Sequence, residues 1–85
     1  MKHAGAAALD ELGDLIAAIR AAATLTERKR GVFYRGREAA LHFHEDKAGL
    51  FADWRVRRGD PDFTRFPVGA PAERAAFLAL FTAAP

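Results

Sequence analysis

The sequence predicts a small α+β domain: a four-stranded antiparallel meander with two helices on one face, an open-faced two-layer sandwich. Apolar residues recur every three or four positions near both ends, which is typical of amphipathic helices. Between them the pattern changes to alternation, and glycine-containing turns separate the alternating runs. A chain of 85 residues has room for one hydrophobic core, so residues 1–85 are expected to form a single domain.

The first helix is expected over residues 6–24 and the second from Pro71 onward, because proline suits the first helical position. Two apolar stripes define the helix faces that should contact the sheet. The stripes are Leu9, Leu12, Ile16, Ile19 and Ala23 in the first helix, and Phe77, Leu80, Phe81 and Ala84 in the second. The charged segment 26–31 is interpreted as a connector, and its basic residues as a solvated helix end or, alternatively, a phosphate contact.

Strands are expected over residues 32–35, 39–45, 50–57 and 63–68. A two-residue turn that begins with Gly36 joins the first two strands and sets Val32 opposite Leu41. A four-residue turn over residues 46–49 then pairs His42 with Asp53. The resulting order is α-β-β-β-β-α.

The alternation divides the sheet residues between two faces. The apolar face, which should receive both helices, contains Val32, Tyr34, Leu41, Phe43, Ala52, Trp54, Val56, Phe66 and Val68. The other face, here called the helix-free face, mixes basic and aromatic residues, and in this register Arg55 lies opposite Arg65. The candidate binding residues on it are Phe33, Arg35, His42, His44, Phe51, Asp53, Arg55 and Arg65.

Three phenylalanines, Phe33, Phe51 and Phe63, would make an apolar patch on the helix-free face. Monomers seldom expose such a patch, so the first functional hypothesis is a non-enzymatic binding or assembly module that forms a homodimer through this face. Cover of the rings by neighbouring arginine stems is an alternative that needs no partner. A second alternative is a single-stranded nucleic-acid-binding domain, in which the rings stack on bases and arginines follow the phosphates.

The segment around His42 and His44 gives a third functional hypothesis. Two residues apart on a strand, the imidazoles project to the same face, and the predicted register adds Asp53. Two imidazoles and a carboxylate are a plausible ligand set for zinc or a similar divalent metal. A histidine paired with a carboxylate without metal is the other interpretation.

Residue types that the chain lacks exclude several kinds of chemistry. There is no serine or cysteine, so serine and cysteine nucleophiles and disulfides are impossible, and no phosphate-binding glycine loop is present. A non-enzymatic role is therefore favoured over an enzyme with a Glu/His acid–base pair, for which no group of residues stands out. The formal net charge of +2 permits an anionic partner without requiring one. With no secretory leader and no apolar run of the roughly 18 residues that a membrane span needs, the expected location is cytoplasmic, without a membrane partner.

Overall fold

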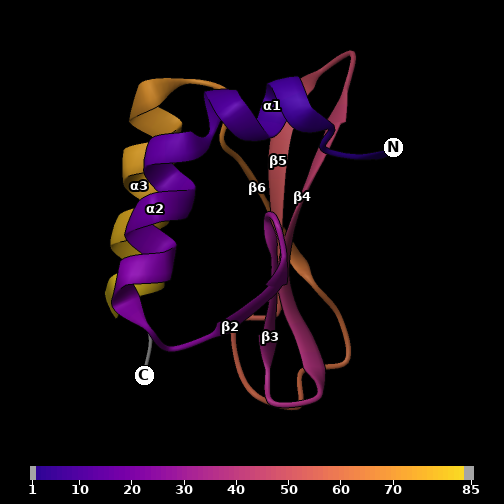
Figure 1. Ribbon diagram of the computed structural model, residues 1–85, viewed down its shortest axis with the longest axis vertical. Helices are drawn as coiled ribbons and strands as arrows, with labels where there is room; N and C mark the ends of the chain where they lie inside the picture. The colour runs from indigo at the N-terminus through magenta and orange to yellow at the C-terminus, as the bar shows by residue number, and fades with distance from the viewer. Residues whose placement is uncertain (1, 84–85) are drawn as a thin grey trace.

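The computed structural model describes residues 2–83, which fold into six strands and three helices (Figure 1). In chain order the elements are β1 (Lys2–His3), α1 (Ala6–Glu11), α2 (Gly13–Ala22), β2 (Thr26–Lys29), β3 (Val32–Arg35), β4 (Glu38–Asp46), β5 (Gly49–Trp54), β6 (Thr64–Pro67) and α3 (Pro71–Ala83). Ala84, expected in the last helix, lies outside the described residues. The predicted α+β class is confirmed.

All the strands belong to one antiparallel sheet in the order β2-β3-β4-β5-β6. The four predicted strands are β3 to β6, and they form the expected meander. β5 pairs with β4 from Leu41 to Asp46 and occupies one edge of that strand. On the other edge β3 reaches Leu41, and β1 pairs farther along, with His3 opposite His44. Two strands from different parts of the chain therefore share one edge of β4.

The helices lie together on one side of the sheet, as predicted, with α2 and α3 packed side by side (Figure 1). The two stripes meet the apolar sheet face in a single core. Its buried members are Leu12, Leu15, Ile16, Ile19, Phe33, Leu41, Phe43, Ala52, Trp54, Val68, Phe77 and Phe81. Within residues 2–83, no helix combines the length and apolarity needed to cross a membrane.

The predicted placement of Phe33 on the helix-free face is wrong, because the β3–β4 ladder contains an irregularity. Arg35 pairs with Glu38 and Tyr34 with Ala39, but Phe33 then pairs with Leu41. The extra residue on β4 is a bulge, and it shifts the remainder of β3 by one position. Phe33 is consequently buried in the core beside Leu41, with 1% of its surface exposed, whereas Tyr34 is only partly buried.

The N-terminal half also departs from the prediction. The expected helix over 6–24 is interrupted at Leu12 (φ −86°, ψ 8°), just before Gly13, which favours helix less than any residue but proline. The expected connector at 26–31 is instead β2 and a turn, and that turn contains Gly31 (φ 77°). Glycine suits this positive φ, and a β-carbon at Gly31 would also lie 2.7 Å from Leu9 Cδ2, so a larger residue there would displace the Leu9 side chain.

Three smaller differences lie in the second half. β5 ends at Trp54 rather than residue 57, so Arg65 pairs with Asp53 and not with Arg55. The predicted like-charge pair is thus replaced by an opposite-charge pair. Leu80 was expected on the buried side of the last helix but is 53% exposed, because Phe77 and Phe81 already fill the contact with the sheet.

The bulge leads to a stability prediction. Phe33→Ala should lower the free energy of unfolding by about 3–5 kcal/mol, the usual cost of removing a buried phenylalanine ring. Phe51→Ala should cost distinctly less, because Phe51 is only partly buried on the helix-free face. Urea unfolding of both variants measures the difference. A larger loss for Phe51→Ala would contradict the observed register.

Candidate metal centre

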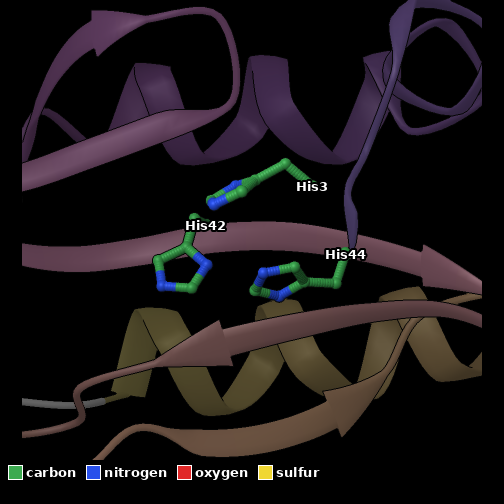
Figure 2. Close-up of side chains that lie close together, drawn as sticks. All are labelled: His3, His42 and His44. Atoms are coloured by element: carbon green, nitrogen blue, oxygen red, sulfur yellow. The ribbon is translucent and has the colours of Figure 1, made fainter. Parts of the chain in front are cut away.

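Three histidines from two strands converge on the helix-free face (Figure 2). His42 and His44 project from the same side of β4, as predicted, with ring centroids 4.7 Å apart. His3 is brought over them by β1, and its ring centroid lies 4.6 Å from that of His44 and 5.3 Å from that of His42. The pairing of β1 with β4 therefore converts a pair of imidazoles into a cluster of three.

The three rings are close to the arrangement that a metal ion requires. One nitrogen from each of His3, His42 and His44 can be chosen so that all three lie within 4.8 Å of one another. Tetrahedral zinc, with zinc–nitrogen bonds of about 2.0–2.1 Å, holds its ligand nitrogens about 3.3 Å apart. An approach of about 1–1.5 Å, within reach of side-chain rotation, would bring the nitrogens to that spacing.

Two ring nitrogens of this cluster are buried and form no hydrogen bond. Nδ1 of His42 and Nδ1 of His44 are inaccessible to water and have no hydrogen-bond partner among the described residues. The Phe63 ring packs edge-on against His42, with centroids 4.6 Å apart, and excludes water from that side. Buried polar atoms are normally paired, since an unpaired one costs about 1–3 kcal/mol. Nδ1 of His42 therefore has unused capacity to bind a ligand, whereas Nδ1 of His44 faces the Asp53 carboxylate.

Asp53, predicted as the third ligand, lies beside the cluster but is already engaged. Its two carboxylate oxygens accept hydrogen bonds from Nε and Nη2 of Arg65, each at 2.6 Å. Oδ2 also lies 2.9 Å from Nδ1 of His44. That contact is close enough for a hydrogen bond but is not aligned as one, so we regard it as electrostatic. Asp53 is thus placed to orient His44.

Burial and charge set the ionisation of the site. Burial, followed by the neighbouring His44, lowers the pKa of His42, and the Asp53 carboxylate opposes this shift only in part. Burial alone would raise the pKa of Asp53, but the Arg65 hydrogen bonds and charge, together with the two histidines, outweigh it and lower that pKa. At neutral pH the site therefore combines a neutral His42, which can bind a metal, with an ionised Asp53.

The other predicted binding residues are distributed more widely. Phe51 is partly buried on the helix-free face, with the Arg65 guanidinium 5.9 Å from its ring centre. Arg55 stacks on Phe63 at 4.5 Å and donates to the carbonyl oxygens of Ala39 and Asp60.

Two predicted binding residues do not lie with the histidines. Arg35 lines a different cavity, with Trp54 and Phe81, because the bulge turns it away from the helix-free face. Phe33 belongs to the core.

Sequence reasoning did not identify His3. The residue stands alone near the start of the chain, 39 positions from His42, and its strand has only two residues. The available signal was the number of histidines. The chain has three, and two of them already shared a face, so His3 was the one histidine left as a candidate third ligand.

Comparison with known proteins adds no family to this description. No family model matches the chain, and neither a curated protein nor a solved structure matches it.

The pKa directions predict how stability depends on pH. Because the pKa of His42 is lower in the folded protein than its ordinary 6.5, the unfolded chain takes up that proton first as the pH falls. Stability should therefore decrease as the pH falls through 6.5 toward the depressed pKa of His42, and a second decrease should follow as the pH falls through 3.8 toward the depressed pKa of Asp53. Urea unfolding at a series of pH values measures both decreases in the free energy of unfolding.

His42→Leu should lessen the first decrease and leave the second in place. A free energy of unfolding that rises as the pH falls through 6.5 would contradict the environment assigned to His42.

Proposed function

We propose that this protein is a metal-binding module that holds a divalent transition metal, most suitably Zn²⁺, through His3, His42 and His44. The observation that carries the proposal is the convergence of three imidazoles, one of which, His42, has a buried ring nitrogen without a hydrogen-bond partner among the described residues. Imidazole is a preferred ligand of zinc, and a site with three protein ligands leaves a fourth position for water or another molecule.

The surroundings of the cluster support this assignment. A ligating histidine usually donates its second ring nitrogen to a carboxylate, which fixes the orientation of the ring. Asp53 Oδ2, 2.9 Å from Nδ1 of His44, is placed for that role, and Arg65 holds the carboxylate in position. The negative charge of Asp53 would also offset part of the charge of the ion. Asp53 is therefore assigned as a positioning residue rather than a ligand.

Zinc binding is tested by thermal unfolding and calorimetric titration. A ligand that binds only the folded state stabilises it, by about 2.7 kcal/mol when free zinc is one hundred times its Kd. For a domain of this size, each kcal/mol raises Tm by about 4–8 °C. Wild-type protein should thus show a large zinc-dependent rise in Tm, and His3→Ala and His44→Ala should each lose most of it.

Lys2→Ala is the matched control for His3→Ala. Lys2 is also exposed on β1, and its ion pair with Glu45 spans 3.9 Å at the surface, so its removal should change stability little. This variant should keep the full zinc response. A wild-type protein without any response, or a His3→Ala variant that keeps the full response, would reject the proposal.

Self-association and single-stranded nucleic-acid binding stay predictions. The apolar patch that suggested a homodimer has lost Phe33 to the core, and Arg55 and Arg65 lie over Phe63 and Phe51. Both changes favour the interpretation in which arginine stems cover the rings.

Sedimentation at high protein concentration tests the dimer. A monomer is the result expected from this packing, and a stable dimer that Phe51→Asp dissociates would restore the first hypothesis.

A further inference from the structure

A cavity of about 570 Å³ lies next to the histidine cluster. It is bounded by the N-terminal segment, α1, the β2–β3 hairpin and β4. Leu9, Val32, Phe43 and the ring of Tyr34 supply apolar lining. The volume falls within the usual range for a small-molecule site, roughly 300–1,000 Å³, and an apolar lining with a few polar groups is typical of such sites.

The polar groups of this cavity are cationic. Arg28, Lys29 and Arg30 all line it, and none of its lining residues is acidic. Arg28 is held in place by stacking 4.3 Å above the centre of the Tyr34 ring and by donating to the carbonyl oxygen of Gly36. Arg30 is ion-paired with Asp10, so Arg28 and Lys29 are the cations that remain beside the apolar walls, and they favour a ligand that has an anionic group on an apolar body.

His3 belongs to both features. It lines the cavity and also contributes one of the three clustered imidazoles. A metal bound by His3 would therefore lie at the wall of the cavity, and its fourth coordination position would be open to an oxygen atom from a ligand inside it.

We propose that this cavity binds a small organic oxyanion, a carboxylate or phosphate-type group on an apolar body, whose oxygen is the exchangeable fourth ligand of the metal. The inference rests on the proposed metal-binding function. It predicts that metal and anion strengthen each other's binding, because each completes the site of the other. Binding linkage requires the two enhancement factors to be equal, and such couplings are typically about 5–150-fold.

The test is calorimetric titration of wild-type protein with Zn²⁺ and with three probes: benzoate, phenylphosphonate and the neutral benzamide. Saturating benzoate or phenylphosphonate should lower the Kd of zinc at least about fivefold, and zinc should lower the Kd of that probe by the same factor. Comparison of the two acids shows which headgroup is preferred. Benzamide should have no effect on zinc binding.

Lys29→Met removes one cation from the cavity and keeps an apolar stem, so it should weaken binding of either acid severalfold. Lys47→Met, in the exposed β4–β5 turn, is the matched control and should change the Kd of neither zinc nor the acids.

The failures of the two proposals are distinguishable. If zinc does not bind at all, the metal-binding function is rejected and this inference with it. If zinc binds but its Kd is unaffected by both acids, or is lowered equally by benzamide, only the oxyanion site is rejected. Binding of an acid without any coupling to zinc would likewise reject its role as a metal ligand.

Discussion

The alternation of side chains along β4 is the constraint on which the remainder of the structure depends. Leu41 and Phe43 face the helices and are buried, while His42 and His44, which alternate with them, face the opposite side. The ladder with β5 runs without interruption from Leu41 to Asp46, so this division is fixed over the whole segment. A shift of one residue would place the imidazoles in the core. Hydrophobic packing on one face therefore determines the position of the candidate metal ligands on the other.

The third histidine of the cluster depends on a much weaker element. β1 has two residues, and it is held by the hydrogen bond from Ala4 N to the Phe43 carbonyl oxygen, at 3.0 Å, and by its pairing with β4. Gly5 N also donates to Oε2 of Glu45 at 2.6 Å. These contacts place His3 above two histidines whose positions the core has already fixed. Two ligands on a rigid strand and one on a short terminal strand make an arrangement in which metal binding would also anchor the start of the chain.

The sequence was informative where the pattern is local and periodic. The β4–β5 register followed from a short turn, and it correctly placed His42 opposite Asp53. The bulge beside Phe33 has no comparable signal, because the extra residue on β4 is Ala40, next to Ala39, and two alanines in a row do not show which of them faces the core. The position of His3 could not be predicted from the sequence for a different reason. Its partner strand lies some 40 residues away in the chain, and two residues are too few to show any period.

The energetics of the cluster indicate what it is suited for. A protein that needed only a covered sheet face could place apolar residues at positions 42 and 44 and avoid the cost of unpaired buried nitrogens. The chain instead has two imidazoles there: Nδ1 of His42 is buried without a partner among the described residues, and Nδ1 of His44 is buried facing Asp53 Oδ2 at 2.9 Å. Departures from the usual rules of packing and polar satisfaction are expected mainly at functional sites. A bound cation would accept lone pairs from the imidazoles and offset the cost of burying them, and this makes metal binding the function that accounts for the most features of the site.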